Sequence, residues 1–410
     1  MPVAPVAPVD EIRALFPALG RQHNGLPVAY LDGPGGTQVP QRVVDTMVAY
    51  LVDHNANSHW CYPTSEETDA MLADARATLA TFLNASPKEI AFGANMTTLT
   101  LHLGRALARK WTPGDEIIVT ELDHHANIDP WRAVARERDL IVRMVRLDAQ
   151  RGELDWDDLT RAITARTRLV AIGAAANAVG TVNDVARVGA VAHERGALLF
   201  ADAVHYAPHA LVDVQALNCD FLACSAYKFY GPHVGVLWGK RVHLESLDLP
   251  KLEPAPSRPP DSLETGTQNH EGIAGAAEAV RFLASLAPDA ADLRQGLHAT
   301  YRSLHERGMA QVTRLWEGLA AFPGVQLYGP PPDRPRTPTI AFALDGRHSR
   351  DVARLLADRA LFVSHGDFYA KRLVDRLGLA ERGLVRVGCV GYTTMDEVER
   401  VIDAVRDIVG

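Results

Sequence analysis

Short apolar runs alternate with amphipathic segments through the middle of this 410-residue chain. Strands that alternate with helices build parallel sheets, and strands covered on both faces read as nearly continuous apolar runs. The pattern therefore predicts an α/β fold with a mainly parallel sheet. Its seven predicted strands are Glu89–Phe92, Glu116–Val119, Ile141–Val145, Leu169–Ala171, Ala197–Ala201, Phe221–Ser225 and Val234–Trp238.

The spacing of strands and helices changes toward the C-terminus and predicts a second, small α+β domain. We expect an N-terminal arm (1–25) that packs with the small domain, a large domain (26–290) and the small C-terminal domain (291–410). The predicted helices are Thr98–Lys110, Asn127–Glu137, Trp156–Ala162, Ala186–Glu194, a long helix after Gly272, Asp289–Leu319, Arg350–Arg359 and Met395–Val409, and the C-terminal strands are Thr339–Leu344, Leu361–Ser364 and Leu384–Gly388.

Composition narrows the class of protein. The chain is 47% hydrophobic and 22% charged with a net charge of −8, values typical of a soluble globular protein and unlike the basic footprint of a nucleic-acid binder. It has no run of ~20 apolar residues, so we expect no membrane span. Its N-terminus has no basic stretch followed by an apolar one, so we expect no signal peptide. Its four cysteines form no CxxC pair, which argues against a structural metal site and favours reduced thiols in the cytoplasm.

Five of the predicted strands end in, or are followed by, residues that are mostly polar. Ligands of open α/β sheets bind at the carboxyl ends of the strands, so these residues are candidates for a shared site. They are Asn95, Met96 and Thr97 after the first strand, His124 after the second, Asn177 after the fourth, Asp202 and His205 after the fifth, and Ser225, Tyr227 and Lys228 after the sixth.

Two of these candidates suggest cofactor chemistry. Asp202 follows a buried strand, where it either caps the next helix or holds a protonated ring nitrogen. Lys228 lies between aromatic residues and a Gly-Pro turn, and burial would lower its pKa and suit it to Schiff-base formation, although most lysines are surface residues. The turn Gly93–Thr98 opens a helix and so either binds phosphate or simply caps that helix. A nucleotide site is disfavoured because no GxGxxG or GK[ST] motif is present.

The motifs together resemble the class V aminotransferase family of pyridoxal 5′-phosphate (PLP) enzymes, and within it the cysteine desulfurase-like group. The resemblance extends from Tyr30 to Arg386, nearly the whole chain. It is carried, in order along the chain, by Tyr30-Leu-Asp-Gly-Pro-Gly-Gly-Thr, Ala-Asn177-Ala-Val-Gly-Thr, Asp202-Ala-Val-His205, Ser225-Ala-Tyr-Lys228-Phe-Tyr-Gly-Pro, Glu264-Thr-Gly-Thr267-Gln-Asn and Arg386-Val-Gly.

The resemblance implies fold type I, PLP as cofactor and a homodimer with a shared active site. It also implies residue roles. Lys228 would hold PLP as a Schiff base, Asp202 would pair with the pyridine nitrogen, His124 would stack on the ring, and Arg386 would bind the substrate carboxylate, although Arg386 could instead form a structural ion pair. Asn177 and His205 would lie near the ring hydroxyl, and the phosphate would be held by Asn95, Met96, Thr97 and Ser225. Thr267 would reach the phosphate of the partner subunit. The cofactor and substrate pocket would be completed by Tyr227, His59 and His365, with simple packing as the alternative for Tyr227 and His59.

The chain departs from the family pattern at two places. Tyr227 stands where the family commonly has a histidine before the lysine. The loop Ser364–Ala370, which should correspond to the mobile loop of desulfurases, contains no cysteine, so persulfide formation on that loop is disfavoured.

We therefore predict a PLP-dependent lyase or transferase in which Lys228, His124 and Asp202 are catalytic. Its substrate is a small L-amino acid, cysteine or a cysteine derivative, which loses its Cα proton and undergoes β-elimination. Transamination, epimerisation, desulfuration and non-catalytic PLP binding remain as alternatives. We expect no metal, nucleic-acid or membrane partner.

Overall fold

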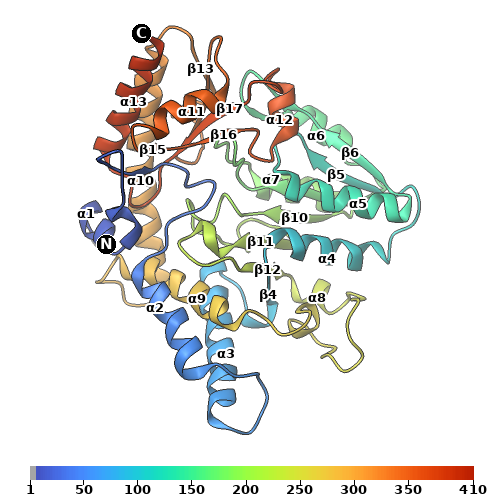
Figure 1. Cartoon of the computed structure of the whole chain (residues 1–410). Coiled ribbons are helices and arrows are strands. Elements are labelled where there is room, and N and C mark those ends of the chain that lie inside the picture. Colours follow the sequence, from blue (N-terminus) through green and yellow to red (C-terminus); the bar gives the residue numbers. More distant parts are fainter. Residues whose placement is uncertain (1–5) are drawn as a thin grey trace.

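The computed structural model of the protein describes residues 6–410 and contains two main sheets with helices packed around them (Figure 1). The larger sheet has seven strands in the order β4–β12–β11–β10–β9–β5–β6. All seven strands match predicted ones, and only β12 runs antiparallel to its neighbours. Their bounds are β4 Ile90–Gly93, β5 Glu116–Thr120, β6 Ile141–Val145, β9 Thr167–Gly173, β10 Leu198–Asp202, β11 Phe221–Ser225 and β12 Gly235–Gly239.

Helices cover both faces of this sheet, as its uninterrupted apolar strands require. Along β9, Leu169 and Ala171 join one hydrophobic core, whereas Val170 and Ile172 join the other. Helices α4 (Met96–Ala108) and α5 (Asp129–Arg138) cover the first face, and α3 (Pro63–Leu83), α7 (Val185–Glu194) and α9 (His270–Ser285) cover the second.

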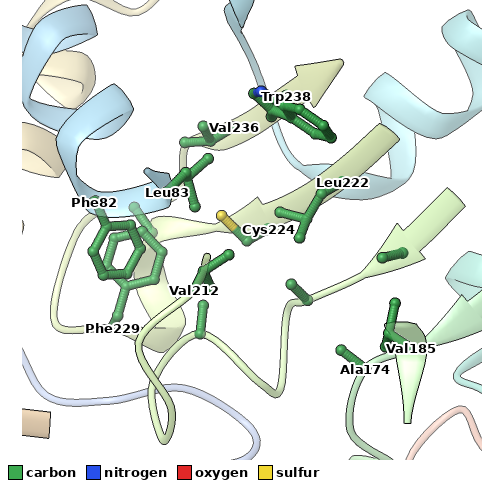
Figure 2. Close-up of a cluster of buried hydrophobic side chains, with 14 of the residues drawn as sticks. Phe82, Leu83, Ala174, Val185, Val212, Leu222, Cys224, Phe229, Val236 and Trp238 are labelled. Carbon is green, nitrogen blue, oxygen red and sulfur yellow. The ribbon is translucent and has the colours of Figure 1, made fainter. Parts of the chain in front are cut away.

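The hydrophobic core between the sheet and helices α3, α7 and α9 shows how closely the sheet and helices pack. Figure 2 shows Leu222, Cys224 and Val236 on the sheet side, near Phe82 and Leu83 of α3. The Phe82 ring lies 4.9 Å from that of Phe229, which follows the helical turn that carries Lys228. Packing on this side therefore supports the segment around the lysine.

The smaller sheet is antiparallel, in the order β13–β14–β17–β16. It consists of β13 (Val325–Tyr328), which was not predicted, β14 (Thr339–Leu344), β16 (Ser364–Gly366) and β17 (Leu384–Gly388). Helices α10 (Leu293–Ala320), α11 (Ser349–Ala357) and α13 (Met395–Val409) pack on it.

The prediction of one continuous strand over Leu361–Ser364 is wrong. The chain changes partners at this point: β15 (Leu361–Phe362) pairs with β3 (Ala29–Tyr30), whereas β16 pairs with β17. The change of partner turns the loop after β16 toward the large sheet, where Tyr369 contacts His124.

The N-terminal segment contacts both parts of the fold. Residues 1–5 of the predicted arm lie outside the described residues. Arg13 of α1 (Val9–Ala14) pairs with Glu397 of α13 at 3.0 Å. Phe16, two residues after α1, packs against Phe282 of α9. The predicted domain bounds stay predictions.

The remaining elements are short or connect the two sheets. In chain order they are β1 Gln22–His23, β2 Leu26–Pro27, α2 Gln41–Ala49, β7 Leu147–Asp148, β8 Glu153–Leu154, α6 Trp156–Ala162, α8 Arg241–Leu244 and α12 Lys371–Arg376. Within residues 6–410, no helix combines the length and the apolar character needed to span a bilayer.

Candidate active site

A cavity of about 1050 Å³ lies at the carboxyl ends of β5, β9, β10 and β11, four strands adjacent in the sheet. This is the position at which open α/β sheets bind ligands. The structure brings together eleven of the predicted site residues around this cavity. They are Asn95, Met96, Thr97, His124, Asn177, Asp202, His205, Ser225, Tyr227, Lys228 and Arg386.

Lys228 ends a 3₁₀ turn (Ala226–Lys228) directly after β11, and it is buried. Its ammonium donates a hydrogen bond to the Pro34 carbonyl and lies 4.7 Å from the centre of the Tyr227 ring. Burial, reinforced by the positive charge of Arg386, lowers the Lys228 pKa to about 7. A substantial fraction of this amine is therefore neutral and nucleophilic near neutral pH.

Asp202 is the last residue of β10 and is also buried. Its Oδ1 accepts a hydrogen bond from the Val204 backbone N–H at 2.9 Å. Burial raises the pKa of this carboxyl to about 6, against the opposing effects of that hydrogen bond and of Lys228. A protonated ring nitrogen would supply the cationic partner that a buried carboxylate needs.

The N-terminus of α4 has the features of an anion site. The side chain of Asn95 caps the helix by accepting from the Thr98 N–H at 3.0 Å, and Ser225 Oγ accepts from the Met96 N–H at 3.1 Å. Among residues 6–410, the Thr97 N–H has no acceptor in the protein. A free N–H at the positive end of a helix dipole suits a phosphate group.

His124 is largely buried at the edge of the cavity, and its Nδ1 accepts a hydrogen bond from the Ala126 N–H at 2.9 Å. Burial lowers the His124 pKa to about 4, and the charge of Lys228 contributes further. His124 is therefore neutral at pH 7, and its proton sits on Nε2, because Nδ1 is an acceptor.

Arg386 lies in β17 and is held by three acceptors. Its guanidinium donates to Ser364 Oγ at 3.0 Å, to the Asn177 carbonyl at 3.0 Å and to Asp32 Oδ1 at 2.9 Å. The side chain is buried and Asp32 is its only carboxylate partner in the described chain. The arginine is thus oriented toward the cavity, where it can bind a carboxylate.

Three buried polar atoms of cavity-lining residues lack a protein partner in the described chain: His125 Nε2, Asn177 Oδ1 and His205 Nδ1. His205 Nε2 is already hydrogen-bonded to Thr337 Oγ1 at 3.0 Å, and burial keeps the His205 pKa well below its usual value. A neutral imidazole and an amide oxygen suit the ring hydroxyl of PLP. The free N–H of Thr97, the unpartnered polar atoms and the buried Lys228 and Asp202 together fit this cofactor.

Three predicted site residues lie outside the cavity. His59 is exposed and pairs with Asp69 at 3.0 Å, while Thr267 and His365 are exposed elsewhere on the surface. Thr267 was expected to act on a partner subunit, so its role stays a prediction. The roles of His59 and His365 also stay predictions.

Sequence reasoning missed several residues that build the site. Asp123 directly precedes His124 and lines the cavity, and Phe368 covers Arg386 with its ring 4.3 Å from the guanidinium carbon. Asp32 lies in the Asp-Gly-Pro-Gly-Gly turn that also supplies Pro34. The signal for Asp123 was its position after a buried strand, but only the tertiary structure reveals the partners of Asp32 and Phe368.

None of the four cysteines lines the cavity. Cys219, Cys224 and Cys389 are buried, and burial raises the pKa of each thiol to about 12. Cys61 is exposed and lies outside the cavity. The site therefore has no cysteine thiolate of its own in contact with a bound ligand.

Comparison with known proteins decides the family. The profile of the aminotransferase class-V family matches residues 29–401. The chain belongs to the class V aminotransferase family. Two relatives are each 33% identical to this chain over 411 residues. The aminotransferase-like protein FGM3 of Gibberella zeae is aligned over 97% of both chains. A cysteine desulfurase of Dickeya dadantii is aligned over 96% of this chain and 95% of its own length.

Solved structures agree with this assignment. The apo cysteine desulfurase of Thermococcus onnurineus NA1 superposes with a TM-score of 0.89 at 26% identity, covering 99% of both chains. The cysteine desulfurase CsdA of Escherichia coli gives 0.84 at 29% identity, covering 98% of both. A C-DES mutant with glycine covalently linked to its PLP cofactor gives 0.80 at 19% identity over 96% of this chain and 99% of that one, a likeness of fold alone.

The comparisons confirm the resemblance read from the motifs, the α/β fold of type I and the PLP cofactor. This class V family member is a PLP-dependent enzyme. Its site residues fit that cofactor by the geometry described above.

Proposed function

We propose that this enzyme removes the Cα proton of an L-cysteine derivative and eliminates its sulfur substituent from Cβ. The single observation that carries the proposal is a cavity whose residues fit PLP and which contains no cysteine. Desulfuration needs a thiolate to take the substrate sulfur, whereas β-elimination does not.

In this mechanism, the chain's own residues bind, orient and transfer a proton. Lys228 would anchor the cofactor, and its free amine would serve as the base that takes the Cα proton, since its lowered pKa leaves it partly neutral. Asp202 would keep the ring nitrogen protonated. Bound there, PLP supplies an electron sink for the charge that develops at Cα.

Other residues would position the cofactor and substrate. Asn95, Met96, Thr97 and Ser225 would hold the phosphate, and Asn177 and His205 would contact the ring hydroxyl. His124 would cover one face of the ring as a neutral imidazole, while Tyr227 would line the lysine side of the site. Arg386 would bind the substrate carboxylate with its guanidinium.

We also propose a homodimer in which Thr267 contacts the cofactor phosphate of the partner subunit. Supporting this, the segment at and after α2 exposes several large apolar side chains, a feature that marks interaction surfaces. These are Val48, Leu51, Val52, Trp60 and Tyr62. Light scattering of the purified enzyme should give twice the 44.6 kDa chain mass; a monomer with full activity would contradict a shared site.

Product analysis tests the reaction. Incubation of the holoenzyme with L-cysteine and with S-substituted cysteines should release pyruvate, ammonium and the free sulfide or thiol. Alanine with enzyme-bound persulfide would instead show desulfuration, and conversion of the cofactor to its amine form would show transamination. Either result without pyruvate would contradict the proposal.

A further inference from the structure

The loop Asp367–Tyr369, after β16, closes one side of the cavity in an unusual conformation. Phe368 and Tyr369 have φ values of 54° and 57°, so two consecutive bulky residues occupy the left-handed region. This conformation costs backbone free energy and persists only where the surroundings fix it.

Contacts to cavity residues fix the loop. Asn177 Nδ2 donates to the Phe368 carbonyl at 2.9 Å, and the His125 N–H donates to the Tyr369 carbonyl at 2.7 Å. Asp367 Oδ1 accepts the Tyr369 N–H at 3.0 Å. The loop is therefore held against two of the strand ends that carry the site.

This conformation places two aromatic rings on the substrate side of the cavity. Phe368 covers the guanidinium of Arg386. The Tyr369 ring stacks on His124 with a centroid distance of 5.4 Å and an interplanar angle of 29°, yet Tyr369 remains 72% exposed. Tyr369 thus has free ring surface at the mouth of the cavity.

The cavity continues beyond the cofactor residues along an apolar wall. Its apolar residues are Leu101 from α4 together with Ala126, Pro130 and Ala133 from the start of α5 and the turn before it, and the charged Asp129 and Arg136 of α5 line the cavity beside them. At about 1050 Å³ the cavity lies at the top of the range of about 300–1,000 Å³ for pockets that enclose drug-sized ligands, which leaves room beside PLP for a substrate larger than a three-carbon amino acid. Free cysteine would leave the apolar wall in contact with water.

We propose that the substrate is an S-substituted cysteine whose apolar substituent packs against Tyr369 and this wall. The inference rests on the proposed function, because it assigns the leaving group of that elimination. Lys228 takes the Cα proton, and the electron pair of the C–H bond forms a Cα=Cβ bond. The Cβ–S bond breaks as this double bond forms, and its electron pair leaves with sulfur, which takes a proton. Water hydrolyses the remaining fragment, so substrate and one water give thiol, pyruvate and ammonium.

A binding series on the holoenzyme tests the inference without turnover. L-2-Aminobutyrate, L-norleucine and L-homophenylalanine carry no leaving group, and their dissociation constants can be measured by titrating the cofactor absorbance. Burial of apolar surface tightens binding by about fourfold per methylene. We expect the dissociation constant to fall at least about 30-fold from aminobutyrate to homophenylalanine.

Variants locate the effect. Tyr369→Phe keeps the ring and should keep the trend, whereas Tyr369→Ala and Leu101→Ser should each remove most of the gain for homophenylalanine and leave aminobutyrate unchanged. Leu355→Ala, on the exposed face of α11, is the matched control for loss of an apolar surface residue. The intact cofactor band of each variant shows that its site has folded.

Turnover supplies an independent readout. The kcat/KM for pyruvate release should rise from L-cysteine through S-methyl- to S-benzyl-L-cysteine. A flat or reversed binding series in the wild-type enzyme overturns the inference, and so does an equal loss for all three ligands in Tyr369→Ala. The proposed function is tested separately: pyruvate release from L-cysteine alone would uphold it and overturn this inference, whereas absence of pyruvate from L-cysteine and from every thioether would contradict the proposed function itself.

Discussion

The Oδ1 atom of Asp123 accepts a hydrogen bond from the backbone N–H of Gly173 across two neighbouring strand ends, at a distance of 2.5 Å. Gly173 in turn stands opposite Asp202 in the ladder between β9 and β10. Two buried carboxyl groups therefore flank a residue that has no side chain. This arrangement supports the floor of the proposed cofactor site.

Replacement of Gly173 by alanine should disturb that floor. A Cβ at this position would lie 2.6 Å from Asp123 Oδ1, closer than real contacts allow. We expect Gly173→Ala to lower the free energy of unfolding by about 1–3 kcal/mol and to weaken PLP binding. Gly20→Ala, whose added Cβ would meet nothing within 4 Å, is the matched control. Equal melting temperatures and PLP affinities for the two variants would show that the close contact is unimportant.

Asp123 should make stability depend on pH. Burial raises the pKa of Asp123 to about 8. The negative charge of Asp202 adds to this rise, whereas the hydrogen bond from Gly173 opposes it. Between pH ~4 and ~8, the unfolded chain releases this proton while the folded apoprotein retains it, so this group's contribution to the free energy of unfolding falls as pH rises. Asp123→Asn removes that fall. Urea unfolding of both apoproteins from pH 5 to 8 should show the variant gaining stability relative to the wild type, whereas parallel curves would contradict a protonated Asp123.

Asp32 should stabilise Arg386 by supplying its negative partner. Asp32→Ala leaves a buried guanidinium without a carboxylate, and we expect a loss of about 1–2 kcal/mol, reduced from the full cost of a broken buried pair because Asp32 is 43% exposed. Ser364→Ala removes a neutral partner of the same arginine and should cost less. Denaturant unfolding measures both, and an equal loss would argue that the charge of Asp32 is not what matters.

The low pKa of Lys228 should appear in the rate at which apoprotein takes up PLP. Only the neutral amine attacks the cofactor aldehyde, and burial lowers the Lys228 pKa to about 7 from an ordinary value near 10.4. The uptake rate, followed by absorbance from pH 5.5 to 9.5, should therefore rise through pH ~7 and level off above it. An uptake rate that still increases tenfold per pH unit at pH 9 would show that the Lys228 pKa is not lowered, as for a solvent-exposed lysine.

The sequence predicted much of the fold because local patterns determine it. All seven strands of the large sheet could be predicted because they are buried, unbroken apolar runs, such as Thr167–Gly173. The helices between them could be predicted because amphipathic segments separate these runs. The split of Leu361–Ser364 between two partners was not predictable, because each half pairs with a segment distant in sequence.

The candidate site divides in the same way. Lys228, Asp202 and His124 follow strands and could be placed at one sheet edge from sequence order alone. Phe368 and Asp32 reach Arg386 only through tertiary packing, and their own sequence neighbourhoods contain no sign of that contact. The two left-handed residues of the loop were equally hidden, since neither is glycine or asparagine.

The most direct test of the account is to locate the covalent attachment of PLP. The purified enzyme should show a visible cofactor band that borohydride bleaches, and mass spectrometry of the reduced protein should find the pyridoxyl group on Lys228. Lys228→Ala should bind PLP without that stable link. Attachment at another lysine, or a full visible band that persists in Lys228→Ala, would contradict the site described here.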